Sequence, residues 1–386
     1  MNLSSVSHPL SRYGWDDGWD AVFAPYASQG LVPGRVVRVD RGLCSVVVAD
    51  GDAVTELRAG TADVASPDPM PAVCTGDFVA VDREAGERPS VRALLPRRSA
   101  FVRSTSSKRS EGQVLAANID HIVICVSLAV ELDLGRVERF LALAMSGAGG
   151  GAASHESAPS GERGAQPLVV LTKADLVPDV AGLSYLVADA EAVAPGVPVL
   201  PVSAATGDGV DVLTAVLGGG TAVLLGQSGA GKSTLANTLL GSEVQDVRSA
   251  RDSDGKGRHT TTTRDLLPLP GGGVLIDTPG LRGVGLWDAE DGVTQVFAEI
   301  EALAQECRFH DCSHTAEPGC AVIGAVGNGA LAARRLESYR KLLRENERIA
   351  ARTDMRLRAE MRRAWKQKQA LGRHMVERKR GPLRKP

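Results

Sequence analysis

Hydrophobic and polar residues follow one rhythm near the start of the chain. From Gly34 onward, short β-branched runs such as GRVVRV, CSVVVAD, GDFVAVD and SVRALLP are bounded by Gly and Asp. Short strands with turn signals between them predict a small all-β barrel or sandwich, and an OB-like barrel is the leading candidate. We assign residues 31–112 to this domain. Residues 1–30 show no clear periodicity, and we expect them to form a flexible extension.

From residue 113 the pattern changes to apolar runs that alternate with helical spacing. The runs HIVICVSL, PLVVLT, PVLPVS and TAVLL predict buried strands, and LGRVERFLALAM and STLANTLL have the spacing of helices. This alternation is typical of a mostly parallel sheet with helices on both faces. We assign residues 113–286 to this α/β domain. Within it, the low-complexity segment 146–166 is expected to be a disordered insertion.

Composition and hydropathy restrict the setting of the protein. The chain is 43% hydrophobic and 23% charged, and it has no apolar run near the ~20 residues that span a membrane. The first 20 residues lack the cationic start and apolar stretch of a secretory signal. We therefore expect a cytoplasmic protein with no membrane partner, in which disulfides are rare. We further expect the protein to be a monomer. Of six cysteines, Cys44, Cys74 and Cys125 lie in or beside strand-like runs and are expected to be core thiols.

The net charge of −2 hides a strong asymmetry. Residues 334–386 carry 19 Lys and Arg against 6 Asp and Glu, and residues 351–386 are predicted to form a basic helical tail. Such a segment fits a polyanion, with nucleic acid favoured over a solvated helix face. The run RRSAFVRSTSSKR, from Arg97 to Arg109, is compatible with a phosphate-contacting loop or with a linker.

The most specific motif is GQSGAGKST, which follows an apolar strand and opens a helix. Backbone N–H groups in such a loop surround a nucleotide β-phosphate at a helix N-terminus. Lys232 would bridge the β- and γ-phosphates, and the Ser233 hydroxyl would bind Mg²⁺. The predicted phosphate-binding residues are Gly226, Gln227, Ser228, Gly229, Ala230, Gly231, Lys232, Ser233 and Thr234.

Two further elements follow the phosphate loop. VLIDTPG is a strand that ends at Asp277, which would hold a Mg²⁺ ligand water, and the N–H of Gly280 would sense the γ-phosphate. GRHTTTTRDL supplies four threonines, of which Thr261 is our candidate Mg²⁺ ligand, although the sequence leaves the choice among them open. Leu281 stands where many GTPases have a water-orienting Gln. His259 is therefore our candidate for positioning the water, unless it only packs against the loop.

The base-reading elements lie upstream of the phosphate loop. LTKAD resembles the guanine-specifying N-K-x-D motif, with Asp175 accepting from guanine N1 and N2 and Lys173 lying along the base. Thr172 replaces the usual Asn, and its hydroxyl can make only part of the amide's hydrogen bonds. VSAAT, with Ser203 and Ala204, resembles the second guanine element. The order of the motifs predicts a circularly permuted GTPase domain that binds GTP, GDP and Mg²⁺.

After this domain comes CRFHDCSHTAEPGC, which contains Cys307, Cys312, His314 and Cys320. Three thiolates and one imidazole fit a closed tetrahedral structural zinc site, with one Zn²⁺ per chain. His310 could compete as a ligand, but the spacing favours His314. We assign residues 287–350 to a mostly helical zinc-binding domain, stabilised by the metal because so small a module has little core.

Taken together, QVLAANIDHIV, LTKADL, GQSGAGKST, GRHTTTTRDL, DTPGLR and CRFHDCSHTAEPGCAV resemble the RsgA/YjeQ family of ribosome small subunit-dependent GTPases. The resemblance covers roughly residues 34–345. It implies an OB-fold, a permuted GTPase domain and a zinc-binding domain. It further implies a late maturation factor of the 30S subunit that binds 16S rRNA, hydrolyses GTP faster on that subunit and releases ribosome-binding factor A.

Two other functions are compatible with parts of the sequence. A permuted GTPase acting on the large subunit is disfavoured because such proteins generally lack this barrel together with this cysteine spacing. A nucleotide-dependent rRNA-binding scaffold with little hydrolysis is disfavoured by the intact Lys232, Ser233 and Asp277.

Overall fold

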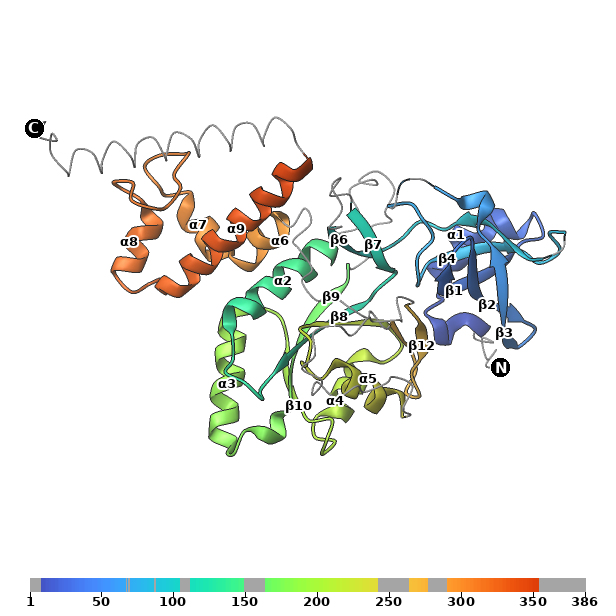
Figure 1. Ribbon diagram of the computed structural model, residues 1–386, viewed down its shortest axis with the longest axis horizontal. Helices are drawn as coiled ribbons and strands as arrows, with labels where there is room; N and C mark the ends of the chain where they lie inside the picture. Colours follow the sequence, from blue (N-terminus) through green and yellow to red (C-terminus); the bar gives the residue numbers. More distant parts are fainter. Residues whose placement is uncertain are drawn as a thin grey trace, which may run out of the picture.

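The computed structural model describes residues 8–66, 68, 70–86, 88–104, 112–148, 164–241, 264–276 and 290–353. Figure 1 shows an N-terminal barrel at one end, a central sheet covered by helices, and a helical C-terminal module at the other end. The predicted architecture, a barrel followed by an α/β domain and a helical module, is confirmed.

The barrel closes from five strands in the order β1-β2-β3-β5-β4. Neighbouring strands pair antiparallel except β3 and β5, which pair in parallel. Inward-facing Val36, Val46, Val79 and Val91 are fully buried and form its core. Closure satisfies the strand edges, which selects the barrel over the sandwich. The strands are β1 (Val32–Asp40), β2 (Leu43–Asp50), β3 (Ala53–Gly60), β4 (Phe78–Asp82) and β5 (Ser90–Leu94), with η2 (Ala62–Val64) after β3.

The expectation of a flexible extension is wrong for residues 8–30, which form η1 (Pro9–Tyr13) and α1 (Asp17–Ala27). Trp15, Trp19 and Phe23 are buried, and the rings of Trp15 and Trp19 contact Phe78 of the barrel. Burying three aromatic side chains provides several kcal/mol, about 2 kcal/mol each, which compensates for ordering the segment.

A hairpin of β6 (Ala100–Ser104) and β7 (Gly112–Ala117) links the barrel to the central domain, so the predicted boundary at 112/113 falls inside β7. The arginines before it are used within the protein. Arg97 forms an ion pair with the fully buried Asp77 at 2.6 Å. Arg98 forms an ion pair with Asp16 and stacks on the ring of Trp19. For these two residues the structure supports a linker and not a phosphate-contacting loop.

The central sheet has the order β10-β9-β8-β11-β13-β12, and only β12 runs antiparallel to its neighbour. Alternate residues of β8 face two separate apolar clusters: Ile122 and Ile124 face one, Val123 and Cys125 the other. Both faces are therefore covered, as near-continuous apolar strands predict. The strands are β8 (His121–Ser127), β9 (Gln166–Thr172), β10 (Val199–Val202), β11 (Thr221–Gly226), β12 (Leu266–Pro268) and β13 (Val274–Ile276). The helices are α2 (Leu134–Ala148), η3 (Ala174–Leu176), α3 (Val180–Val193), α4 (Val210–Leu217) and α5 (Lys232–Leu240).

The predicted insertion is shorter than 146–166 at both ends. Helix α2 continues to Ala148, the buried Ala165 precedes β9, and β9 begins at Gln166. Residues 149–163 lie outside the described part of the chain, so the expected disorder stays a prediction for them.

The C-terminal module packs directly on α2. It contains α6 (Glu290–Val296), α7 (Ala298–Ala304), α8 (Ala321–Gly327) and α9 (Ala333–Thr353). A Cβ on Gly292 of α6 would overlap the carbonyl oxygen of Ala142 in α2. The fully buried Glu138 of α2 accepts hydrogen bonds from Arg334 and Arg335 of α9. These contacts fix the module to the central domain.

The cysteines divide as predicted. Cys44, Cys74 and Cys125 are buried, and burial raises the pKa of each thiol to about 12. They are core thiols. In the part of the chain that the structure describes, no helix combines the length and apolarity needed to cross a membrane.

Candidate functional site

The phosphate loop connects the central strand β11 to α5, as the motif predicts. Gly226, the last residue of β11, has a φ of 154°, and a Cβ there would lie 2.5 Å from the Cys125 carbonyl oxygen. Gly229 and Gly231 both have a φ of 81°, in the left-handed region that glycine tolerates. Gly231 is the N-cap of the nine-residue helix α5, and as a glycine it has no side chain that could accept hydrogen bonds from the first N–H groups of the helix. The N-cap therefore leaves these N–H groups available to a phosphate.

Lys232 lies over this loop. Its Nζ donates to the carbonyl oxygens of Gly226 and Gln227, each at 2.8 Å. The ammonium group is thus held at the mouth of the loop. A bound β- or γ-phosphate would replace these carbonyl oxygens as its hydrogen-bond acceptor. Ser233 follows on the first turn of α5 and is partly exposed.

The predicted base-reading residues reach the phosphate loop from the end of β9. The Thr172 side chain is buried, and its hydroxyl donates to the Ala230 carbonyl oxygen at 2.7 Å. Lys173 has a φ of 60°, and its Nζ donates to the Gly229 carbonyl oxygen at 3.0 Å. Parallel strands end at one edge of the sheet, so these residues and the phosphate loop lie together although they are far apart in sequence.

Asp175 and Ser203 bring the two guanine elements together. The Ser203 hydroxyl donates to Asp175 Oδ1 at 2.6 Å, and it accepts from the Thr206 N–H at 3.1 Å. Ser203 is fully buried, whereas Asp175 is exposed. The bond orients the carboxylate and leaves Oδ2 for a ligand. Ala204 is the next residue after Ser203 and is partly exposed.

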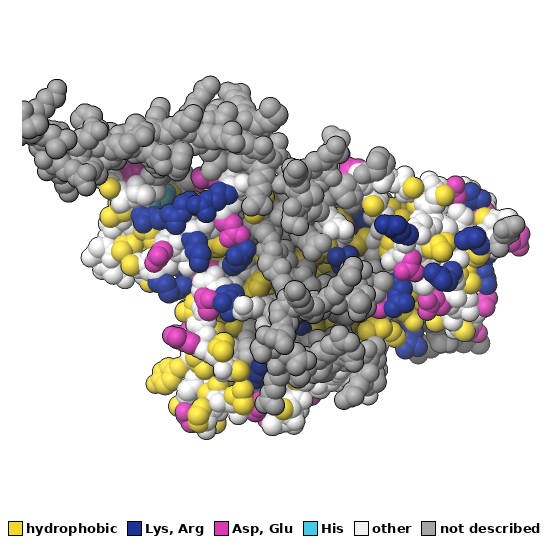
Figure 2. Space-filling view, viewed as in Figure 1, with side chains coloured by type: hydrophobic (Ala, Val, Ile, Leu, Met, Phe, Trp, Pro, Cys, Tyr) yellow, Lys and Arg dark blue, Asp and Glu magenta, His cyan; other side chains and the backbone are white. Residues whose placement is uncertain are grey.

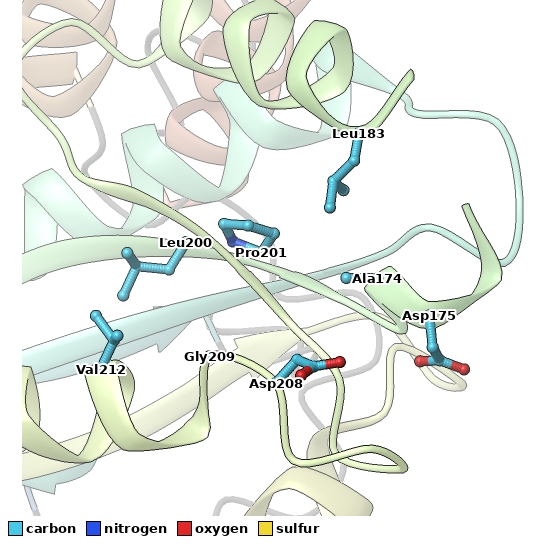
Figure 3. Close-up of a pocket in the computed structure, with 8 residues that line it drawn as sticks. All are labelled: Ala174, Asp175, Leu183, Leu200, Pro201, Asp208, Gly209 and Val212. Atoms are coloured by element: carbon cyan, nitrogen blue, oxygen red, sulfur yellow. The ribbon is translucent and has the colours of Figure 1, made fainter. Parts of the chain in front are cut away.

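A hollow of about 450 Å³ lies beside these elements, between α3 and α4 and over β10. Figure 3 shows Leu183 and Val212 pointing toward the space beside Pro201, with Asp175 and Asp208 at one end. It contains no residue of the phosphate loop. The hollow therefore adjoins the base-reading element and does not overlap the phosphate site.

Four predicted residues, His259, Thr261, Asp277 and Gly280, lie outside the described part of the chain. Their flanking strands are described: β12 begins three residues after Thr263, and β13 ends at Ile276. These two strands pair with each other, and β13 pairs with β11. The described strands β12 and β13 therefore belong to the sheet that carries the phosphate loop.

The C-terminal module brings Cys307, Cys312, His314 and Cys320 together. Their donor atoms all lie within 4.8 Å of one another. Cys307 Sγ lies 3.8 Å from Cys320 Sγ, and His314 Nδ1 lies 3.6 and 3.5 Å from these sulfur atoms. A tetrahedral site with metal–sulfur bonds of about 2.3 Å and metal–nitrogen bonds of about 2.0 Å has donor separations of about 3.5–3.8 Å. The four residues therefore fit one metal ion, and the three cysteines among them are free and not in disulfides.

The loop between these ligands is organised by Glu317, which the sequence analysis did not single out. Its carboxylate accepts from the N–H groups of Ser313, Thr315 and Ala316 at 3.1, 2.7 and 3.0 Å. These bonds, with one from the Ser313 hydroxyl as the leading cause, hold the pKa of Glu317 well below its usual range. The bonds to Ser313 and Thr315 hold the backbone on either side of His314, whose φ of 55° lies in the left-handed region. A carboxylate placed between two cysteine ligands is the sequence signal for such a role.

Burial lowers the pKa of His314. The neutral imidazole, which is the form that binds metal, is therefore favoured at neutral pH. His310 is exposed and is not among the four clustered residues, which supports the preference for His314.

The fold and site define the class of protein as a circularly permuted P-loop GTPase with a barrel before it and a metal-binding module after it. The family model described as RsgA GTPase matches residues 158–287. A small ribosomal subunit biogenesis GTPase RsgA of Streptomyces avermitilis is 68% identical over 380 residues, covering 98% of this chain and 97% of that one. Its counterpart in Streptomyces coelicolor is 67% identical over 376 residues, covering 97% of both chains.

Two solved structures share the fold. YjeQ from Thermotoga maritima has a TM-score of 0.56 at 24% identity, covering 82% of this chain and 98% of that one. YloQ, described as a circularly permuted GTPase, has a TM-score of 0.57 at 21% identity, covering 82% and 95%. The chain belongs to the RsgA family and is a GTP hydrolase.

Proposed function

We propose that this GTPase is a late maturation factor of the small ribosomal subunit, which binds 16S rRNA and hydrolyses GTP faster when bound to that subunit. The observation that carries the proposal is the 68% identity, over 98% of this chain, to a relative named as a small ribosomal subunit biogenesis GTPase. Release of ribosome-binding factor A would accompany the cycle. The GTP-bound form would bind the subunit tightly, and hydrolysis would release it.

The proposed nucleotide site combines the two ends of the permuted domain. The loop of Gly226–Thr234 holds the phosphates, with Lys232 on the β- and γ-phosphates and Ser233 on Mg²⁺. Asp175 selects guanine, supported by Ser203 Oγ at 2.6 Å. Thr172 and Lys173 tie this element to the phosphate loop, and Ala204 offers its N–H to guanine O6. Thr261, Asp277 and Gly280 complete the Mg²⁺ and γ-phosphate contacts, and His259 orients the water.

We propose Zn²⁺ as the ion of the Cys307, Cys312, His314 and Cys320 cluster. The donor atoms of Cys307, His314 and Cys320 are 3.5–3.8 Å apart, as in a tetrahedral set, and all four donors lie within 4.8 Å of one another. Three thiolates with one imidazole favour zinc over hard cations. Four protein donors leave no open position for substrate, so the ion would be structural.

The C-terminal helix supports rRNA as a partner. Lys341, Arg344 and Arg348 of α9 are exposed and follow one another at spacings of three and four, which places them on one helix face. Figure 2 shows dark blue side chains gathered in the region of α9 on the face in view. A basic stripe of this kind matches a phosphate backbone.

A phosphate-release assay with and without purified small subunits tests the proposal. We expect clear stimulation by small subunits, none by large subunits, and loss of both basal and stimulated activity in Lys232→Ala. An unchanged rate with small subunits would contradict the proposed stimulation. It would favour the second candidate, an rRNA-binding scaffold with little hydrolysis.

A further inference from the structure

An apolar groove lies at one edge of the central sheet. Strand β10 is the last strand on its side of the sheet, and α3 packs on one face while α4 packs on the other. The hollow of about 450 Å³ opens between these two helices, and Leu183 and Val212 point toward it in Figure 3. Its floor is formed by Leu200 and Pro201 of β10. Consecutive strand residues face opposite sides of a sheet, so the hollow lies on the edge itself.

Exposed apolar side chains extend the hollow along both helices. Val180, which is 81% exposed, lies three residues before Leu183 on α3, so the two share a helix face. Val216 lies four residues after Val212 on α4, and these two valines are 40% and 49% exposed. Apolar side chains that gather at one place on a folded surface mark an interaction site. We define the α3–α4 groove as Val180, Leu183, Leu200, Pro201, Val212 and Val216.

The surroundings of the groove are acidic. Residues 173–217 contain six acidic residues and one basic residue, Lys173. Asp175 and Asp208 stand at one end of the hollow, Asp211 directly precedes Val212, and all three acidic side chains are exposed. Figure 2 shows yellow and magenta side chains over the region of α3, below the dark blue side chains of α9. A surface of this charge repels a phosphate backbone and attracts a cationic partner.

The edge strand favours a helix over an added strand as the occupant. Pro201 lies within the four-residue β10 and has no N–H to donate to a further strand. Its carbonyl oxygen is also approached closely by Gly209, where a Cβ would lie 2.5 Å away. An amphipathic helix needs no backbone partner, because it places apolar side chains at spacings of three and four into a groove. A second copy of this chain is disfavoured, since a twofold contact would set the acidic surface against itself.

We infer that the α3–α4 groove binds a basic, amphipathic helix of a protein of the small ribosomal subunit. The chemistry of this partner follows from the groove, and its place on the subunit rests on the proposed function. Basic side chains of the helix pair with the acidic residues around the groove, and its apolar side chains enter the hollow between Leu183 and Val212. The protein thus contacts the subunit in two ways, with the basic face of α9 on rRNA and the α3–α4 groove on protein.

A matched pair of substitutions tests the charge that the groove meets. Val212→Lys places a cation in the groove, and Val130→Lys places one at an exposed valine outside it; the two valines are 49% and 64% exposed. We measure the dissociation constant for small subunits with a non-hydrolysable GTP analogue, basal hydrolysis and melting temperature. We expect Val212→Lys to weaken subunit binding by about three- to tenfold and Val212→Glu to weaken it less, with basal hydrolysis and melting temperature nearly unchanged. Val130→Lys should not weaken binding.

Unchanged or tighter binding by Val212→Lys would overturn the inference, because a cation beside rRNA strengthens binding. An equal loss in Val130→Lys would overturn it as well. The unmodified protein is measured in the same series: if it does not bind small subunits, the proposed function fails and the inference fails with it. If it binds and the groove variants bind equally well, the groove alone is refuted.

Photo-cross-linking identifies the occupant. The photoreactive amino acid p-benzoylphenylalanine replaces Val180 in the full chain, the complex with purified small subunits is irradiated, and the cross-linked product is identified by mass spectrometry. We expect a helical segment of a subunit protein that is rich in Lys and Arg and has apolar residues at spacings of three and four. Cross-links to rRNA, to a second copy of the chain or to residues 354–386 of the same chain, or no cross-link at all, would each overturn the inference.

Discussion

At the residue scale, one hydroxyl explains a departure from the guanine motif. Thr172 replaces the usual Asn, and its side chain ties the end of β9 to Ala230 at 2.7 Å. The sequence predicts that a threonine hydroxyl can make only part of the hydrogen bonds of an asparagine amide. The hydrogen bond that Thr172 makes in the structure is the one to the phosphate loop. In the proposed site, base selection would then depend on Asp175, whose carboxylate accepts a hydrogen bond from Ser203.

Asp175→Asn is expected to lower GTP affinity by about 10- to 100-fold, because a charge-assisted hydrogen bond to guanine is lost. The same variant should prefer xanthosine triphosphate, whose 2-keto group accepts from an amide. Competition binding of the two nucleotides measures this. Ser203→Ala should weaken GTP less and without change of preference, and a variant that still prefers GTP would refute the assignment of Asp175.

Glu317→Ala is expected to speed metal release from the cysteine cluster, because the loop that carries His314 loses its acceptor for three N–H groups. Release to a chromogenic chelator measures the rate, with exposed Glu306→Ala as the control. The folded pKa of Glu317 is depressed, so its contribution is fully present above its ordinary pKa and is lost only as the pH falls toward the folded value. Faster release between pH 8 and pH 6 would therefore have to come from another group, such as a ligand.

At the element scale, most elements follow from hydrophobic spacing, and the exceptions have physical causes. The buried runs of β8, β9 and β11 are near-continuous in apolar residues, so their strands and parallel packing could be predicted. Helix α1 was missed because its polar residues obscure the spacing of Trp15, Trp19 and Phe23, which recur every four residues. That spacing, with Asp16 as N-cap, is the signal that could have found it.

The functional motifs could be located from sequence, but their contacts could not. Nothing in the sequence indicates that Lys173 reaches Gly229 or that Arg38 reaches Asp265, since such pairs depend on how the strands are arranged. The same holds for Arg97, whose partner Asp77 is set by the closure of the barrel.

The contact of α6 with α2 gives a prediction for an element. Gly292→Ala should destabilise the protein by about 1–3 kcal/mol, because the new Cβ would overlap the Ala142 carbonyl oxygen of a rigid helix. Gly324→Ala in α8 is the matched control, since a Cβ there meets no atom within 4 Å and alanine favours the helix. Thermal melting of both variants checks this: equal melting temperatures would contradict the close approach of the two helices.

At the scale of the whole molecule, the C-terminal module is bound to the central domain by more than the chain that leads into it. Arg335 donates to Glu138 at 2.9 Å and to Glu299 at 2.6 Å, and it stacks on Phe297. If the module tilts when the nucleotide changes, it must either carry α2 with it or break the buried Arg335–Glu138 ion pair, at a cost of about 3–5 kcal/mol. Movement of α2 together with the module therefore costs less free energy.

Removing residues 354–386 should weaken binding to small subunits and make it less sensitive to salt. This segment carries 12 Lys and Arg against 3 Asp and Glu, and each phosphate contact releases counterions. Co-sedimentation over a series of salt concentrations measures the slope, and GDP affinity of the shortened chain serves as the control. An unchanged slope would exclude the tail from the interface.

The strand order also has a consequence for how the chain folds during synthesis. The half-sheet β8-β9-β10 and its guanine elements are complete before β11 is made, because permutation places residues 121–203 ahead of the phosphate loop. The edge of β8 that later pairs with Ala222–Gly226 of β11 therefore stays unpaired until β11 has been synthesised. The last half to emerge thus completes both the sheet and the phosphate site, so a bound nucleotide would stabilise only the finished domain. Guanine nucleotide should accordingly raise the yield of refolded protein, because it binds and stabilises the domain only after β11 has paired with β8.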